Sequence, residues 1–232
     1  MMNNHQQYFS VVSENEYFVV INKHDNINFH SEDGEFGVVV AAEKFLKQKL
    51  YSVHRLDKMT SGLLLLAKSS VVANDLSMLF KNQQIQKYYV AISDKKPKKK
   101  QGLIKGGMEK SRRSMWKLTN NKENLAITQF FSYSLSEGKR LFIVKPKTGK
   151  THQIRVALKS ISSAICGDHL YAEKHNQYDR GYLHAYQIQF NLYGQDFSFS
   201  CLPTTGTLFL AQPFLQQLAL LGNADLLAWP KV

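Results

Sequence analysis

Short apolar runs alternate with charged and polar stretches along the first half of the chain, and their spacing predicts alternating strands and helices. The run YFVVI at 17–21 is rich in β-branched and aromatic residues, which favour a strand. Residues 37–50 and 71–80 place apolar side chains at helical spacing. The unbroken run GLLLLA at 62–67 is typical of a buried strand, and 87–92 is strand-like as well.

The second half of the chain is dominated by runs of aromatic and β-branched residues, which predict an antiparallel sheet. Thr151 is predicted to cap a helix in which Ile154, Leu158 and Ile161 share one face. The predicted fold class is therefore α+β, a mixed α/β fold. Strands are expected at 114–119, 125–133, 140–145, 183–190 and 197–202, and a closing helix at 213–221.

Length and composition indicate a folded protein with a sizeable core. The chain has 232 residues, of which 44% are hydrophobic. No internal repeat and no linker divides it. Cys166 and Cys201 lie far apart without CxxC or His-rich spacing, so neither a zinc site nor a disulfide framework is indicated, and both are interpreted as small core residues.

The charge balance favours nucleic acid as a partner. Thirty Lys and Arg oppose 18 Asp and Glu, which gives a formal net charge of +12 and the electrostatic signature of a polyanion binder. The N-terminal residues lack a basic stretch followed by an apolar core, and no apolar run approaches the roughly 18 residues that a membrane span needs. We expect a cytoplasmic protein with no membrane role.

Much of the positive charge lies in one segment. Between Lys95 and Arg113, nine basic residues face one acidic residue, a net charge of +8. Its glycines and its lack of periodicity predict a long exposed loop over 94–113. A merely solvated charge run is one interpretation, and a loop that clamps RNA phosphates is the one we favour. The residues expected to contact RNA are Lys98, Lys99, Lys100, Arg112 and Arg113.

The run HRLDKMTSG at 54–62 carries the strongest candidate chemistry. It places the Asp57 carboxylate between two cations, Arg55 and Lys58, next to the buried strand. The run is predicted to be a loop between two strands. Taken alone it can equally be a surface ion pair of Asp57 with a neighbouring cation.

Several motifs, in order, resemble the RluA-type pseudouridine synthases. They are HRLDKMTSGLLLLAK (54–68), KYYVA (87–91), TGKTHQIRVAL (148–158), GDHLY (167–171) and LHAYQIQF (183–190). The resemblance implies a pseudouridine synthase fold, with a mainly antiparallel central sheet, flanking helices and loops, and a catalytic cleft across the sheet. It also implies a short extension at 1–16 and a catalytic domain at 17–232, without the S4 RNA-binding domain of many relatives.

The resemblance implies an isomerase that converts uridine in ribosomal RNA or tRNA to pseudouridine, with no metal and no organic cofactor. Asp57 matches the family's catalytic aspartate, Tyr89 its tyrosine and Arg155 its arginine. An ionised carboxylate can attack the ribose or stabilise a cationic sugar as the base leaves. A nearby guanidinium favours the charged form of a carboxylate, so Arg155 is expected to hold Asp57 ionised and oriented. Tyr89 offers a face for stacking and a phenol for proton transfer.

Further roles follow for the neighbours of Asp57. The target base must be flipped out of its helix, and Arg55 matches the arginine that takes part in this. If 54–57 is extended, Arg55 and Asp57 point to one side while His54 and Leu56 point to the other. His54 is included among the RNA-binding candidates, although a histidine hydrogen-bonded within the loop is an alternative. Loop-shaping roles are assigned to Thr60, Ser61 and Gly62.

Other candidates have structural alternatives. His152 is interpreted as a histidine bonded at a helix start, Tyr88 as a core strand residue, and Trp116 as either an RNA-stacking or a core side chain. The family's Asn-Lys-Pro-x-Gly turn is replaced at 22–26 by Asn-Lys-His-Asp-Asn, which predicts a different turn shape. The histidine that often follows HQIRV is replaced by Ala157.

Two further functions remain open beside the isomerase. One is a non-catalytic RNA-binding or RNA-folding protein that uses the same cleft and charge. The other is a glycoside hydrolase, for which a second well-placed acid is lacking. The expected partner is a structured RNA stem-loop, and the expected state is a monomer.

Overall fold

The computed structural model describes residues 7–31, 36–112, 114–173 and 175–231. The chain forms two compact units. The first comprises residues 1–86 and 185–202, and the second comprises residues 87–184 and 203–232. The chain therefore leaves the first unit, builds most of the second, and returns to the first before its C-terminal segment completes the second.

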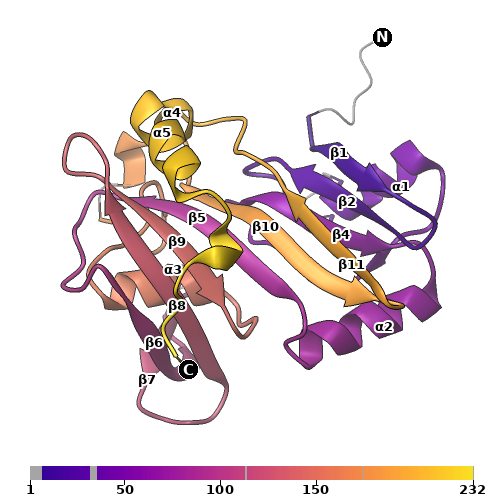
Figure 1. Ribbon diagram of the computed structural model, residues 1–232, viewed down its shortest axis with the longest axis horizontal. Coiled ribbons are helices and arrows are strands. Elements are labelled where there is room, and N and C mark those ends of the chain that lie inside the picture. The colour runs from indigo at the N-terminus through magenta and orange to yellow at the C-terminus, as the bar shows by residue number, and fades with distance from the viewer. Residues whose placement is uncertain (1–6, 32–35, 113, 174, 232) are drawn as a thin grey trace. The chain divides into compact units, whose positions relative to one another are not determined.

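The first unit is built on a sheet in which β1 with β2, β2 with β4, β3 with β4 and β10 with β11 pair antiparallel (Figure 1). Its main strands lie in the order β1-β2-β4-β10. The strands are β1 (Phe9–Glu14), β2 (Phe18–Lys23), β3 (Tyr51–Ser52), β4 (Ser61–Ala67), β10 (Leu183–Leu192, except its first two residues) and β11 (Gln195–Ser200).

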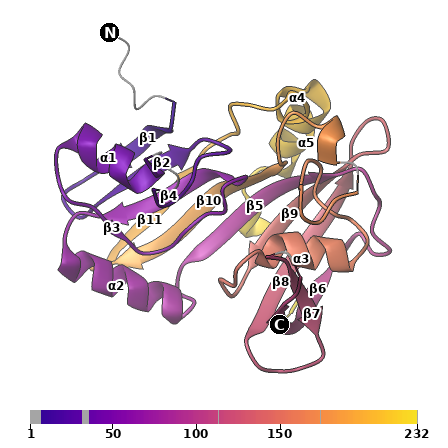
Figure 2. The same cartoon turned by 180° about the vertical axis from the view of Figure 1, so that it is seen from behind.

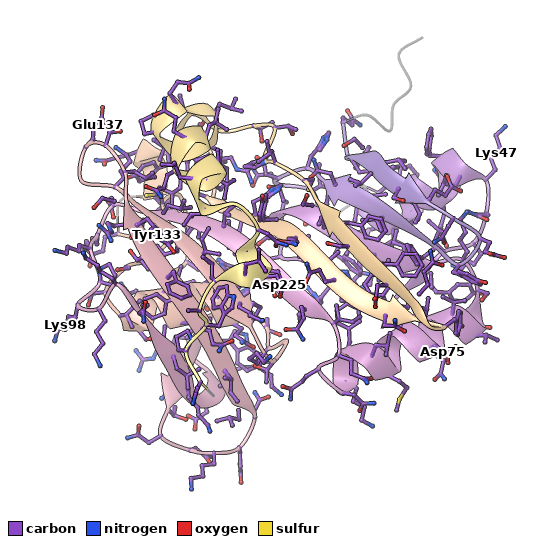
Figure 3. All side chains as sticks on the ribbon, viewed as in Figure 1. Lys47, Asp75, Lys98, Tyr133, Glu137 and Asp225 are labelled. Atoms are coloured by element: carbon purple, nitrogen blue, oxygen red, sulfur yellow. The ribbon has the colours of Figure 1, made fainter. Side chains whose placement is uncertain are left out.

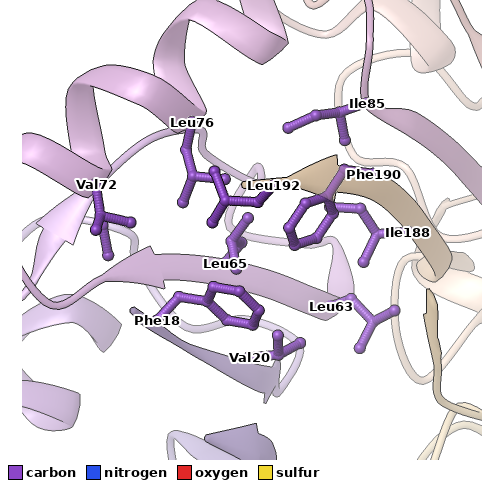
Figure 4. Close-up of a cluster of buried hydrophobic side chains, with 11 residues drawn as sticks. Phe18, Val20, Leu63, Leu65, Val72, Leu76, Ile85, Ile188, Phe190 and Leu192 are labelled. Carbon is purple, nitrogen blue, oxygen red and sulfur yellow. The ribbon is translucent and has the colours of Figure 1, made fainter. Parts of the chain in front are cut away.

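The core of this unit explains the unbroken apolar run of β4, because every residue of that strand is buried. Leu63 and Leu65 pack on one face of the sheet with Val72 and Leu76 of α2 (Ser70–Lys81) (Figure 4). Helix α2 begins where the Ser69 side chain accepts a hydrogen bond from the amide of Val72. Helix α1 spans Val38–Leu46 and buries Val38, Ala41 and Ala42.

The second unit is built on an antiparallel sheet in the order β5-β9-β8-β6-β7. Its strands are β5 (Gln86–Ser93, after its first residue), β6 (Gln101–Lys110), β7 (Trp116–Thr119), β8 (Leu125–Ser134) and β9 (Arg140–Pro146). Its helices are α3 (Gln153–Ser160), α4 (Thr207–Leu210), α5 (Gln212–Leu221) and the 3-10 turns His175–Gln177 and Ala224–Leu226.

Different segments cover the two faces of this second sheet. Helix α3 lies against β7, β8 and β9 on one face (Figure 2). The C-terminal segment lies on the other face (Figure 1). There the Trp229 ring packs against Phe131, and the Gln129 amide donates to the carbonyl oxygen of Pro230. Side chains that alternate along a strand of this sheet therefore meet either α3 or the C-terminal segment.

The structure confirms most of the predicted elements and corrects two predictions. The prediction of one long loop over 94–113 is wrong, because β6 occupies 101–110 and pairs with both β7 and β8. The predicted cap of α3 is also wrong. Its N-cap is His152 in a left-handed conformation rather than Thr151, and the His152 side chain makes no capping hydrogen bond. Strand β1 lies within the predicted extension at 1–16 and pairs with β2.

The sequence predicted no membrane span and two cysteines in the core, and the structure bears on both predictions. Among the described residues, no helix combines the length and the apolar character that crossing a bilayer requires. Cys166 and Cys201 are both thiols, and burial raises the pKa of the Cys166 thiol to about 11 and that of Cys201 to about 12. Both thiols stay protonated at neutral pH, and Cys166 is fully buried while Cys201 packs against the first unit's core.

Candidate active site

The loop that carries Asp57 connects β3 to β4 within the first unit. The Asp57 carbonyl oxygen accepts a hydrogen bond from the Thr60 amide at 3.0 Å, which closes a turn directly after the carboxylate residue. Leu56 is buried and Arg55 is exposed, with Asp57 half-buried between Leu56 and the exposed Lys58. The burial of Leu56 fits the predicted inward direction of that side chain, and a shared side for Arg55 and Asp57 stays a prediction.

His54 fastens the start of this loop to β4. Its Nε2 accepts a hydrogen bond from the Leu65 amide at 2.9 Å, so its ring proton lies on Nδ1. The imidazole also stacks on the Phe80 ring of α2, with centroids 4.7 Å apart. These contacts agree with the interpretation of His54 as a loop histidine, and its contact with RNA remains a prediction.

Three residues after the turn shape the end of the loop. Thr60 and Ser61 are buried, and Gly62 has a φ of +109°, a conformation that other residues rarely adopt. A Cβ atom on Gly62 would lie only 2.3 Å from the backbone oxygen of Ala185. Only glycine therefore fits at this second position of β4, in agreement with a loop-shaping role for Gly62, and the roles of Thr60 and Ser61 stay predictions.

Lys23 is a site residue that sequence reasoning missed. Its side chain is fully buried, and its Nζ donates to the carbonyl oxygens of His24, Ile27 and Lys58 at 2.9, 2.9 and 3.2 Å. The altered turn at 22–26, with Asn26 in a left-handed conformation, is thereby joined to the loop that carries Asp57. The one signal in the sequence was the Asn22-Lys23 pair that the turn keeps from the family pattern.

Tyr89 lies in β5 on the face of the second sheet that α3 covers. It stands opposite Val144 of β9, which in turn stands opposite Phe130 of β8, and directly opposed residues share a face. Phe130 shares its face with Thr128, two residues away, whose hydroxyl accepts a hydrogen bond from the Gln153 amide of α3. Tyr89 and the helix of Arg155 are thus on the same side of this sheet.

Tyr88 points to the opposite face, as predicted for a core strand residue. It is fully buried, and its phenol donates to a carboxylate oxygen of Asp225 in the C-terminal segment (Figure 3). Burial, followed by this hydrogen bond and the carboxylate charge, raises the pKa of Tyr88. The Lys145 ammonium lies 5.0 Å from the Tyr88 ring and 5.6 Å from the Trp229 ring.

Lys87 begins the KYYVA motif and lies two residues before Tyr89 on the same face of β5. Burial, reinforced by the charge of Lys147, lowers its pKa to about 8. The ammonium is therefore only partly protonated slightly above neutral pH. Sequence reasoning assigned no role to this side chain.

Arg155 is buried in the first turn of α3, where it forms a two-bond ion pair. Its Nε lies 2.7 Å from Oδ2 of Asp168, and its Nη2 lies 2.8 Å from Oδ1. The structure thus gives Arg155 a carboxylate partner within its own unit, one that sequence reasoning did not assign. The signal was available, since Asp168 belongs to the GDHLY motif.

Tyr171, from the same motif, links Arg155 to the helix start. Its ring centroid lies 5.1 Å from the guanidinium carbon of Arg155. Its hydroxyl accepts from the Trp116 amide at 2.8 Å and lies 3.0 Å from Nδ1 of His152. His152 is thus bonded at the helix start as predicted, and the partly buried Trp116 packs with Met108 and Tyr171, in agreement with its core interpretation.

The basic residues predicted to bind RNA lie in two separate places in the second unit. Lys98, Lys99 and Lys100 are exposed in the short connection before β6, and Lys98 points away from the ribbon (Figure 3). Arg112 is exposed in the turn after β6, and Arg113 lies outside the described residues. Within the described ranges, no group of three His, Cys, Asp or Glu side chains is arranged to hold a metal ion.

Comparison with known proteins gives the family. The model of the RNA pseudouridylate synthase family matches residues 17–160, more than half of the chain. An RNA pseudouridine synthase of Haemophilus influenzae, named as uncharacterized, is 46% identical over 209 residues, which cover 90% of this chain and 93% of that protein. The chain belongs to the RNA pseudouridylate synthase family. Membership identifies it as an isomerase that acts on RNA and confirms the resemblance carried by the motifs.

Two further similar proteins are aligned with this chain over a smaller share of their own length. Ribosomal large subunit pseudouridine synthase C of Rickettsia bellii is 43% identical over 124 residues, 51% of this chain and 41% of that protein. A solved human structure, RNA Pseudouridylate Synthase Domain Containing 1, has a TM-score of 0.73 at 20% identity, covering 84% of this chain and 83% of that one. This structural likeness supports the predicted α+β pseudouridine synthase fold.

Proposed function

We propose that this pseudouridine synthase modifies specific uridines in structured ribosomal RNA or tRNA and uses Asp57 as its catalytic carboxylate. The observation that carries the proposal is the fixed geometry of the Asp57 loop. His54 binds β4 at one end, the turn from Asp57 to Thr60 closes the middle, and Lys23 bonds to the Lys58 carbonyl oxygen. A carboxylate on so constrained a loop can be aimed at one atom of a bound nucleotide.

The chemistry assigned to Asp57 needs its ionised form. The carboxylate attacks C1′ of the ribose or stabilises the cationic sugar while the bond from C1′ to N1 breaks. C5 of the rotated base then bonds to C1′ and displaces the carboxylate wherever it was attached, C5 loses its proton, and N1 gains one. Tyr89 is proposed to stack on the target base and to assist loss of the C5 proton, and Arg155 to stabilise negative charge during the reaction. No step of this scheme requires a metal ion or an organic cofactor.

RNA binding is assigned to exposed cations. Arg55 is exposed and lies two residues before Asp57, so its planar guanidinium is proposed to stack in the gap that the flipped base leaves. Lys98, Lys99, Lys100 and Arg112 are proposed to contact phosphates. For Arg113, which lies outside the described residues, the proposed contact with phosphates is based on the sequence alone. We expect a monomer that works in the cytoplasm, where ribosomal RNA and tRNA are found.

Large-subunit ribosomal RNA is the first substrate to test, because the Rickettsia bellii relative is named for the ribosomal large subunit. Transcripts labelled with tritium at C5 of uridine release the label when C5 forms its new bond. We expect release by the wild type and by Asp75→Asn. Asp75 is half-buried on α2 (Figure 3), and its carboxylate accepts a hydrogen bond from Tyr193. Asp57→Asn should bind the RNA but release no label.

Other outcomes separate the alternative functions. Tight binding without release from ribosomal RNA or tRNA by the wild type would favour a non-catalytic RNA-binding protein. Free uracil among the products would indicate a hydrolase. Equal release by Asp57→Asn and the wild type would remove Asp57 from the mechanism while leaving the isomerase assignment in place.

A further inference from the structure

The guanidinium of Arg155 is held in one plane by Asp168. The arginine side chain is 3% exposed and the aspartate 0%. The two bonds, Nε to Oδ2 and Nη2 to Oδ1, run in parallel at 2.7 and 2.8 Å. Such a two-bond pair fixes both the position and the orientation of a guanidinium, which a single contact does not.

The Asp168 carboxylate is itself immobilised by its own loop. Its Oδ1 accepts hydrogen bonds from the amides of Leu170 and Tyr171 at 3.0 and 3.2 Å. Gly167 precedes it with a φ of +73°, and a Cβ there would lie 1.8 Å from the Arg180 backbone oxygen. The loop therefore packs tightly against backbone and cannot carry the carboxylate away from Arg155.

Tyr171 restrains the guanidinium further. Its ring centroid lies 5.1 Å from the Arg155 guanidinium carbon. Its hydroxyl is fixed by the Trp116 amide and His152. The arginine is thus bonded by Asp168 and in cation–π contact with Tyr171.

Stability alone is a poor reason for this arrangement. The cost of desolvating two buried charges largely offsets their attraction, so a packed apolar pair often serves a fold as well. A buried pair does supply geometry, because the two bonds to Asp168 fix the plane of the guanidinium and with it the direction of every N–H donor of Arg155.

We propose that Asp168 is a positioning residue, which together with Tyr171 orients Arg155 for the isomerisation. The inference rests on the function proposed above, in which Arg155 acts on the reacting nucleotide. Asp168 itself touches no substrate in this scheme. Its loss should slow the chemical step and leave the binding of RNA unchanged.

Single-turnover kinetics test this separation. Asp168→Glu keeps the charge but shifts the carboxylate by one methylene, so we expect a rate about 10- to 100-fold below the wild type. The dissociation constant for RNA should stay within about twofold, because phosphate contacts dominate affinity. Asp196→Glu makes the same change at an exposed carboxylate that is bonded to Asn191, and it is the matched control, with a rate close to the wild type. A wild-type rate for Asp168→Glu, or a loss of affinity that matches the loss of rate, would overturn the inference.

A second test, by ¹⁵N NMR, does not depend on activity and therefore also applies to variants whose folding is impaired. The Arg155 Nε–H, assigned as the ¹⁵N signal that disappears in Arg155→Lys, should exchange slowly with solvent in the wild type and faster in Asp168→Glu and Asp168→Asn. Fast exchange in the wild type, or an unchanged signal in Asp168→Asn, would contradict positioning by Asp168. Absence of tritium release by the wild type would instead reject the proposed function, and this signal would still show whether Asp168 orients Arg155.

Discussion

The Lys23 ammonium lies 3.2 Å from the backbone carbonyl oxygen of Lys58, and this contact joins the end of β2 to the loop that carries Asp57. Two further carbonyl oxygens, of His24 and Ile27, lie 2.9 Å from the same nitrogen. Three carbonyl oxygens thus surround a group that has three N–H donors. Because the side chain is fully buried, this arrangement fixes the turn after β2 and the candidate catalytic loop together.

Replacing Lys23 by methionine should destabilise the protein and slow the reaction. The variant keeps the length of the side chain but leaves buried carbonyl oxygens without their donor, so the free energy of unfolding should fall by about 2–4 kcal/mol. Urea unfolding and single-turnover kinetics measure the two effects. The control is Lys58→Met, because Lys58 contributes only its backbone oxygen to this contact and its side chain is exposed. Equal stability of the two variants would show that the buried ammonium does not anchor the loop.

Gly62→Ala should be strongly destabilising, because the new Cβ would meet the Ala185 backbone and the φ of +109° is unfavourable for alanine. Strain and steric conflict add, so we expect a loss of more than about 3 kcal/mol in the free energy of unfolding. Gly138→Ala provides the control. Gly138 has a φ of +73°, and a Cβ added there would meet no atom within 4 Å, so only backbone strain of about 1–2 kcal/mol applies. Similar losses in chemical denaturation would contradict a specific fit of Gly62 against Ala185.

The sequence predicted those helices and strands whose apolar residues follow a clear periodic or unbroken pattern. The buried run of β4 and the amphipathic face of α2 were predicted closely. Strand β6 was missed because its lysines and glycines obscure any alternation, whereas its stability comes from backbone pairing with β7 and β8. Charge density in that segment was mistaken for the absence of structure.

The candidate site was predictable to a similar extent. The burial of Leu56 beside the exposed Arg55 fits the predicted alternation along this segment, and a shared side for Arg55 and Asp57 stays a prediction. The contacts of Lys23 with Lys58 and of Asp168 with Arg155 join residues 35 and 13 positions apart. Such contacts depend on how the chain folds back on itself, and no local pattern contains that information. Only the motif residues Asn22-Lys23 and GDHLY marked these positions beforehand.

Lys87 should make the free energy of unfolding depend on pH in the alkaline range. Burial and the nearby charge of Lys147 lower its pKa to about 8 in the folded protein, against 10.5 for an unperturbed lysine. Between these two pKa values the unfolded chain binds more protons than the folded one, so the free energy of unfolding should rise with pH in this window. Below pH 8 the folded protein bears the full cost of burying the charged ammonium. Lys87→Met should therefore flatten the rise when urea unfolding is compared at pH 7 and pH 10. Lys81→Met, at an exposed position of α2, should keep the wild-type slope. A rise of wild-type size in Lys87→Met would show that another group causes it.

Neutralising Lys98, Lys99 and Lys100 with glutamine should weaken RNA binding and its dependence on salt. All three side chains are exposed in the connection before β6. Each phosphate contact contributes about 0.7–0.9 to the slope of log affinity against log salt concentration, so losing the three should reduce that slope by about 2. In the control, Lys44, Lys47 and Lys49 are replaced by glutamine, which removes the same amount of charge. These three side chains are exposed at and beyond the end of α1, where Figure 3 labels Lys47. Affinity can be measured by fluorescence anisotropy from 50 to 300 mM salt. A slope that is unchanged in the first triple, or reduced equally in both, would mean that net charge rather than a phosphate clamp before β6 accounts for the electrostatic part of binding.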